Sequence, residues 1–126
     1  MLVDAPCSGL GTLRRNPDLK WRQSEKAVGE LVAKQTAILD SAARLVKSGG
    51  RLVYATCSVL PQENEAIAQA FGQAHPDFVP LNVAEELQRL KVNGASDLCS
   101  SEGQYLRLWP HRHGTDGFFA AVWVRK

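Results

Sequence analysis

Two cysteines, Cys7 and Cys57, have the side-chain type best suited to covalent chemistry in this sequence. A thiolate is a strong nucleophile, but a free cysteine is mostly un-ionised at neutral pH, so activation requires positive potential nearby. Pro61 suits the first turn of a helix, whose positive end would favour the thiolate of Cys57. The alternative is structural: Cys57 would be a small buried apolar residue and Cys7 a turn residue stiffened by Pro6.

A carboxylate, Asp4, ends the apolar run that leads to Cys7. Such a group is costly unless it meets water, a ligand or a hydrogen-bond donor. Two roles therefore stay open for Asp4: contact with a ligand, or an Asx-type bond that caps the turn at Ser8 and Gly9.

A short basic stretch follows, and it contains one acid and one indole among four cations. Its candidate RNA-binding residues are Arg14, Arg15, Lys20, Trp21 and Arg22. This combination suits a phosphate backbone and a stacked base. The alternative is a solvated loop with Trp21 held in the core.

The histidines and the third cysteine give weaker indications of function. His111 and His113 flank Arg112, but the sequence places no third ligand beside them, so we predict no metal site. Cys99 falls in a polar stretch and is interpreted as incidental. Three cysteines at long spacings do not form a disulfide framework, which indicates a reducing compartment.

The elements that must position these residues alternate between strand-like and helical patterns. Strands are predicted over 1–5, 51–56, 78–81, 105–109 and 118–124, and helices over about 26–47, after Pro61 and, weakly, over 85–90. Pro80 lacks an amide donor and therefore predicts an edge strand. This order predicts right-handed crossovers and a mostly parallel sheet, finished by an antiparallel last strand.

The carboxyl ends of parallel strands meet at one edge of a sheet, where ligands bind in such folds. Residues 4–7 and 56–58 both fall at that edge. If the two strands are neighbours, about 4.8 Å apart, the thiols of Cys7 and Cys57 would face one crevice.

Length and composition set the broad class. The 126 residues suffice for one domain, and 44% hydrophobic with 22% charged residues is typical of a globular protein. The net charge of +2 does not by itself imply nucleic-acid binding, so any basic surface must be local. No apolar run reaches the roughly 20 residues that span a bilayer, and no leader pattern opens the sequence, so we expect a soluble, cytoplasmic protein without membrane contact.

Four strings of residues occur in a specific order over nearly the whole chain. They are Asp4-Ala5-Pro6-Cys7-Ser8-Gly9, then Arg15-Asn16-Pro17-Asp18-Leu19-Lys20-Trp21, then Tyr54-Ala55-Thr56-Cys57-Ser58 with Glu63-Asn64-Glu65, and finally Thr115-Asp116-Gly117-Phe118-Phe119. Together they resemble the RsmB/Sun family of RNA cytosine-5 methyltransferases.

The resemblance implies a role for each site residue. Cys57 would add to carbon 6 of a cytosine, and carbon 5 would then take the methyl group of S-adenosylmethionine. Cys7 resembles the family's second cysteine, implicated in release of the covalent product, and Asp4 resembles the carboxylate beside the methyl donor and the base. The implied substrate is ribosomal RNA, 16S rRNA in the first instance, with the target base unpaired or flipped out.

The resemblance also sets expectations for the domain. Residues 1–126 match a partial S-adenosylmethionine-dependent methyltransferase domain, the carboxyl-terminal half of a Rossmann-like class I sheet. Gly9-Leu10-Gly11 follows a cysteine loop and is not the dinucleotide fingerprint of the family's upstream cofactor-binding half. We therefore expect no methyl transfer by the chain alone, and a homo-oligomer or swapped dimer through an open first strand. The alternative function is a non-catalytic RNA-binding or subunit-interaction module.

Overall fold

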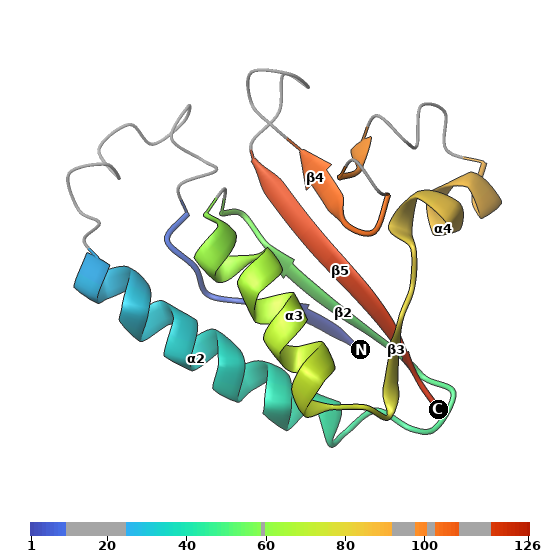
Figure 1. Cartoon of the computed structure of the whole chain (residues 1–126), viewed down its shortest axis with the longest axis horizontal. Coiled ribbons are helices and arrows are strands. Elements are labelled where there is room, and N and C mark those ends of the chain that lie inside the picture. Colours follow the sequence, from blue (N-terminus) through green and yellow to red (C-terminus); the bar gives the residue numbers. More distant parts are fainter. Residues whose placement is uncertain (10–24, 59, 92–97, 101–102, 109–116) are drawn as a thin grey trace.

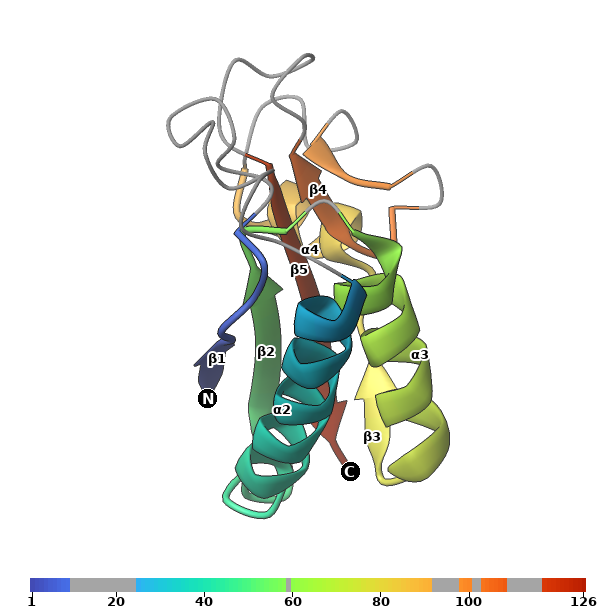
Figure 2. The same ribbon diagram turned by 90° about the vertical axis from the view of Figure 1, so that its left-hand side faces the viewer.

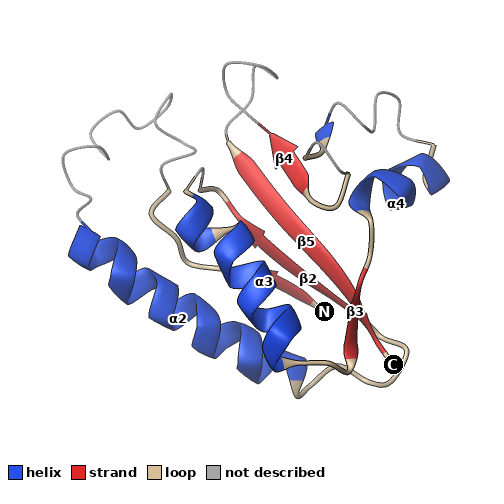
Figure 3. Cartoon of the chain, in the orientation of Figure 1, coloured by secondary structure: helices blue, strands red, loops and turns tan. Residues whose placement is uncertain are grey.

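The computed structural model describes residues 1–9, 25–58, 60–91, 98–100, 103–108 and 117–126. Figures 1 and 3 show its strands and helices in alternation. The strands are β1 (Leu2–Asp4), β2 (Arg51–Thr56), β3 (Phe78–Pro80), β4 (Leu106–Leu108) and β5 (Phe118–Arg125). The helices are α2 (Glu25–Ala43), α3 (Glu65–Ala74) and α4 (Val83–Arg89), with a 3-10 turn over Pro61–Glu63. Every element predicted within these ranges is present, with shifts of a few residues at the ends.

The strands form a single sheet in the order β1-β2-β5-β3, and β4 also pairs with β5. β1 is parallel to β2, whereas β5 is antiparallel to β2, β3 and β4. The other described strands therefore share one direction and only the last strand opposes them, which confirms the predicted α/β class. β3 lies at an edge, as Pro80 predicts, because its missing amide then costs no ladder bond.

The main core lies between the sheet and two helices. α2 and α3 lie side by side over one face of the sheet (Figures 1 and 2). Leu39 of α2 and Ile67 and Phe71 of α3 are buried there against sheet residues that include Tyr54, Leu52, Phe119, Ala121 and Trp123. Because side chains alternate along a strand, Val122 points to the opposite face.

A smaller cluster covers part of that opposite face. α4 packs Val83 and Ala84 against Val122 and Cys99. Cys99 was expected in a polar loop, but its side chain is only 6% exposed and packs in this cluster. A small thiol behaves here as an apolar core residue.

The connection after α2 shows why that helix is shorter than predicted. α2 ends at Ala43 rather than near residue 47. Arg125 of β5 donates from its guanidinium to the carbonyls of Ala43 and Val46, at 3.4 and 2.5 Å, and satisfies helix-end acceptors from outside the helix. Gly49 then turns the chain with a φ of +81°, a conformation that glycine adopts without strain.

β1 lies at the margin of the sheet, where it places the first cysteine loop. The Met1 carbonyl accepts from the Val53 N–H at 2.9 Å, and the Ala5 N–H donates to the Ala55 carbonyl at 3.0 Å. Backbone groups alternate in direction along a strand, so those of Leu2 face away from β2. No described strand pairs with that outer edge.

Candidate active site

The two cysteine loops meet at the carboxyl edge of β1 and β2. The parallel register pairs Asp4 with Ala55, so β1 and β2 leave the sheet at the same level. The sulfur atoms of Cys7 and Cys57 are 3.3 Å apart. Both side chains are partly exposed, so Cys57 is not fully buried as its structural alternative would require. The predicted convergence of the two thiols is confirmed.

The two thiols differ in their readiness to ionise. A hydrogen bond from the Cys7 side chain is the main cause that lowers the pKa of Cys57 to about 7. The same hydrogen bond, followed by burial, raises the pKa of Cys7 above its ordinary value. Cys57 is therefore the thiol that ionises more readily, and Cys7 is the one that stays protonated and can donate to it.

The source of this activation differs from the prediction. A helix end near Pro61 was expected to supply positive potential, but the chain there forms only a 3-10 turn, and α3 begins at Glu65. Glu63, at the end of that turn, opposes ionisation because its negative charge raises the pKa of Cys57. The pKa of Cys57 is thus lowered by a neutral hydrogen-bond donor, Cys7, and not by the helix dipole that the sequence predicted.

Asp4 occupies the last position of β1, and its side chain is exposed. Its charge also acts to raise the pKa of Cys57, which places the carboxylate close to the pair. The backbone N–H of Ser8, in the turn that Asp4 was considered to cap, donates to Glu63 at 2.7 Å. An exposed carboxylate at this edge can accept hydrogen bonds from a ligand.

Glu63 is a fully buried carboxylate beneath the pair, a role that the sequence analysis did not assign. Its Oε1 atom accepts from the Ser8 N–H at 2.7 Å and from Gln35 Nε2 at 3.2 Å. Its Oε2 atom accepts from the hydroxyls of Ser8, at 2.7 Å, and Ser58. The string Glu63-Asn64-Glu65 was noted, but its pattern does not distinguish a buried acid from the partly exposed Glu65.

Asn64, next to Glu63, binds the loop that holds Cys57. Thr56 donates to its side-chain oxygen at 2.5 Å, and its amide nitrogen donates to the Ser58 carbonyl at 2.9 Å. Thr56, Ser58 and Asn64 are all buried, so these bonds operate away from solvent competition. The backbone on both sides of Cys57 is therefore anchored.

Several predicted candidates lie outside the described residues. These are Arg14, Arg15, Lys20, Trp21 and Arg22 of the basic stretch, together with His111 and His113. Among the residues with described structure, no three histidine, cysteine or acidic side chains gather as a metal site would require. Within the same ranges, no helix has the length and apolarity needed to cross a bilayer.

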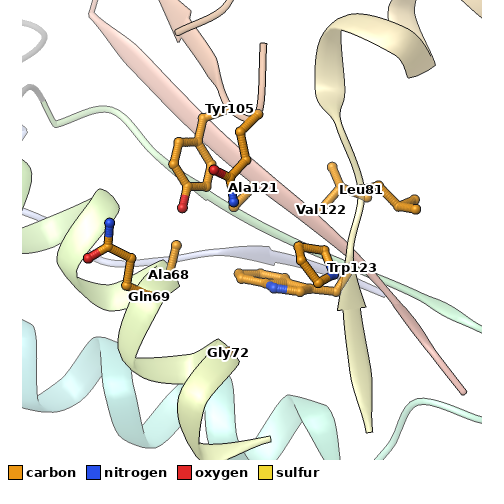
Figure 4. A pocket seen from close by; sticks show the side chains of 10 residues that line it. Ala68, Gln69, Gly72, Leu81, Tyr105, Ala121, Val122 and Trp123 are labelled. Atoms are coloured by element: carbon orange, nitrogen blue, oxygen red, sulfur yellow. The ribbon is translucent and has the colours of Figure 1, made fainter. Parts of the chain in front are cut away.

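A separate cavity of about 110 Å³ lies beside β5, away from the cysteine pair. Figure 4 shows Ala68, Gln69 and Gly72 of α3 on one side of it and Leu81, Tyr105 and Trp123 among the other lining residues. Neither Cys7 nor Cys57 lines this cavity. It does not contribute to the site at the sheet edge.

Comparison with known proteins agrees with the class that the fold and the site define. One similar solved structure is NSun6 from Pyrococcus horikoshii with SFG, which matches 98% of this chain and 29% of its own at a TM-score of 0.75 and 26% identity. A protein named PH0851 in its crystal structure matches 98% of this chain and 26% of its own at a TM-score of 0.84 and 40% identity. The fold is that of a Rossmann-like methyltransferase.

The family follows from the sequence match. The family model of the 16S rRNA methyltransferase RsmB/F matches residues 1–124, and the chain belongs to this family. A probable ribosomal RNA small subunit methyltransferase B from Synechocystis is 46% identical over 95% of the chain and 26% of its own length. Its namesake from Bacillus subtilis is 44% identical over 100% of the chain and 27% of its own length. The chain spans about a quarter of the length of these relatives.

Proposed function

We propose that the protein containing these residues is an S-adenosylmethionine-dependent RNA cytosine-5 methyltransferase that acts on 16S rRNA, with Cys57 as the nucleophile. The observation that carries the proposal is the cysteine pair, with sulfur atoms 3.3 Å apart. The pKa of Cys57, lowered to about 7, supplies a large thiolate fraction at neutral pH. Membership of the family and the names of the relatives support the substrate.

Cys57 performs the covalent step in this proposal. Its thiolate electron pair forms the bond to carbon 6 of the cytosine, and the electrons of the 5,6 double bond make carbon 5 nucleophilic. Bound S-adenosylmethionine supplies the electrophilic methyl group that carbon 5 takes. A base then takes the carbon 5 proton, the electrons of that carbon–hydrogen bond restore the double bond, and the electrons of the breaking sulfur–carbon bond return to Cys57, which leaves as a thiolate. A thiolate suits both the attack and the departure.

Cys7 carries an exchangeable proton within hydrogen-bond distance of that sulfur. Its S–H donates to Cys57 in the free site, and a raised pKa keeps it protonated at neutral pH. Once the Cys57 sulfur is bonded to carbon, its capacity to accept falls, and the Cys7 thiol is free to act on the adduct. We assign Cys7 to the proton transfers that accompany release of the product.

Asp4 is the candidate for holding the base and the methyl donor. Its exposed carboxylate at the end of β1 can accept hydrogen bonds from the exocyclic amine of cytosine or from a bound cofactor. A solved structural relative contains SFG, an analogue of S-adenosylmethionine, which supports use of this cofactor. Arg14, Arg15, Lys20, Trp21 and Arg22 remain the proposed contacts to the RNA backbone and a stacked base.

Transfer of labelled methyl groups from S-adenosylmethionine to unmodified 16S rRNA tests the function in the whole protein. The expected result is 5-methylcytosine in the digested RNA, lost in Cys57→Ala. Cys99→Ser is the matched control, because Cys99 lies in the smaller core cluster away from the site. RNA binding without methyl transfer by the unaltered protein would contradict the proposal and favour the non-catalytic module.

A further inference from the structure

Glu63 lies where the two cysteine loops and α2 meet. Its carboxylate accepts from Ser8 in the first loop, from Ser58 in the second loop and from Gln35 in α2. Gln35 also donates to the Pro6 carbonyl at 2.9 Å, which fixes the first loop a second time. The side chain thus joins segments that lie 55 and 5 positions away from it in the sequence.

We infer that Glu63 is a positioning residue that clamps the Cys7 and Cys57 loops together and so sets the contact between their sulfur atoms. The inference rests on the proposed function of that pair. Glu63 itself does not touch the substrate in this account, because its side chain is 0% exposed.

The burial of Glu63 explains why the clamp is strong. A buried carboxylate requires compensating donors, and hydrogen bonds to a charged acceptor are about twice as strong as neutral ones. Each loop supplies a hydroxyl that donates to this carboxylate, and the two hydroxyls also lie 3.4 Å from each other. Loss of the carboxylate would remove the stronger, charged acceptor from both loops at once. The lowest-energy arrangement therefore keeps Ser8 and Ser58 on the same carboxylate, with Cys7 and Cys57 one position before each of them.

Electrostatics and positioning predict opposite effects of Glu63 on the nucleophile. The negative charge of Glu63 raises the pKa of Cys57. If Glu63 acted only through its charge, its removal would therefore lower the pKa of Cys57 further. Removal of a clamp instead separates the sulfur atoms and weakens the hydrogen bond from Cys7, which is the main cause of the lowered pKa. The sign of the change therefore distinguishes the two roles.

The direction of the change in the pKa of Cys57 can be measured in Glu63→Ala and Glu63→Gln. The rate of Cys57 alkylation by iodoacetamide is followed against pH by peptide mass spectrometry. We expect the pKa of Cys57 to rise in Glu63→Ala, because Ser8 and Ser58 lose their common acceptor. Glu63→Gln keeps an oxygen for the Ser8 N–H while it removes the charge, so its pKa should stay close to 7 or fall below it. A fall in both variants would overturn the inference.

A second measurement reports how close the sulfur atoms of Cys7 and Cys57 lie and does not depend on the charge of Glu63. Diamide takes two electrons and two protons from a pair of thiols, which join as a disulfide, and the reaction is fast only for adjacent sulfur atoms. We expect Cys7 and Cys57 to be linked more slowly in Glu63→Ala than in the unaltered chain. Equal rates would contradict a clamp.

Two further variants keep the result interpretable. Glu65→Gln makes the same change two positions away, at a carboxylate that pairs with Arg107 at 3.1 Å, and should leave both readouts unchanged. If Glu63→Ala does not fold, Ser58→Ala removes one donor from the clamp and should raise the pKa of Cys57 by a smaller amount. Because these readouts need neither RNA nor cofactor, an unchanged thiol pair refutes the clamp, whereas loss of methyl transfer alone bears on the proposed function.

Discussion

Cys7 and Cys57 carry the same chemical group, yet the hydrogen bond between them is the main cause that separates their pKa values. The sequence predicted that both thiols would lie at one sheet edge, because the strand ends could be located from apolar runs and Pro6. The cause of ionisation was not predictable, since a donor 50 positions away becomes a neighbour only after the strands pair. Glu63 was missed for the same reason: its partners come from three separate segments.

At the residue scale, Cys7→Ala should shift the ionisation of Cys57. Without the donated hydrogen bond, the pKa of Cys57 rises from about 7 towards its ordinary value, so the thiolate forms at higher pH. At pH 7 the rate of Cys57 alkylation should fall roughly fivefold, because the loss of thiolate outweighs the greater nucleophilicity of the less acidic thiol. The measurement is the alkylation rate against pH. An unchanged midpoint would show that Cys7 is not the activating donor.

At the element scale, the sheet and the helices were largely predictable because apolar periodicity records which face is buried. The end of α2 was not, because Arg125 arrives from the far end of the chain to bind the carbonyls of Ala43 and Val46. The place of β5 within the sheet was also not predictable from local pattern. β5 lies between β2 and β3, and this arrangement is what lets β1 and β2 remain neighbours at the site.

α2 packs on the sheet and supplies Gln35 to the Glu63 clamp. Two adjacent residues of α2, one buried and one exposed, provide a matched test of this packing. Leu39 is 1% exposed in the core, whereas Ile38 is 39% exposed. Leu39→Ala should lower the free energy of unfolding by about 2–5 kcal/mol, and Ile38→Ala by less than about 1 kcal/mol. Chemical denaturation of both variants measures the difference. Equal losses would mean that α2 does not pack on the sheet as described.

At the scale of the whole molecule, the open edge of β1 is the feature with the clearest consequence. Leu2 is 68% exposed, and the outward backbone groups of β1 have no described strand as a partner. An unpaired edge is a template for another strand, from a second copy or from another part of a longer polypeptide. The chain corresponds to about a quarter of its relatives, and either partner would satisfy the edge.

We predict that the 126-residue chain studied alone self-associates through β1. Sedimentation should show a mass that rises with concentration, and Leu2→Lys should weaken the association because a charge on an edge strand opposes pairing. Ser48→Lys, a matched charge added in the turn after α2, should not weaken it. A monomer at all concentrations, with the amide of Leu2 protected from hydrogen exchange, would contradict this prediction.

The central claim is that Cys57 forms the bond to cytosine beside a second cysteine that does not. Covalent trapping of the whole protein on RNA that contains 5-fluorocytosine, with S-adenosylmethionine present, tests it most directly, because fluorine at carbon 5 blocks release. The account predicts an adduct that is lost in Cys57→Ala and retained in Cys7→Ala. An adduct that persists in Cys57→Ala, or that requires Cys7 instead, would contradict it.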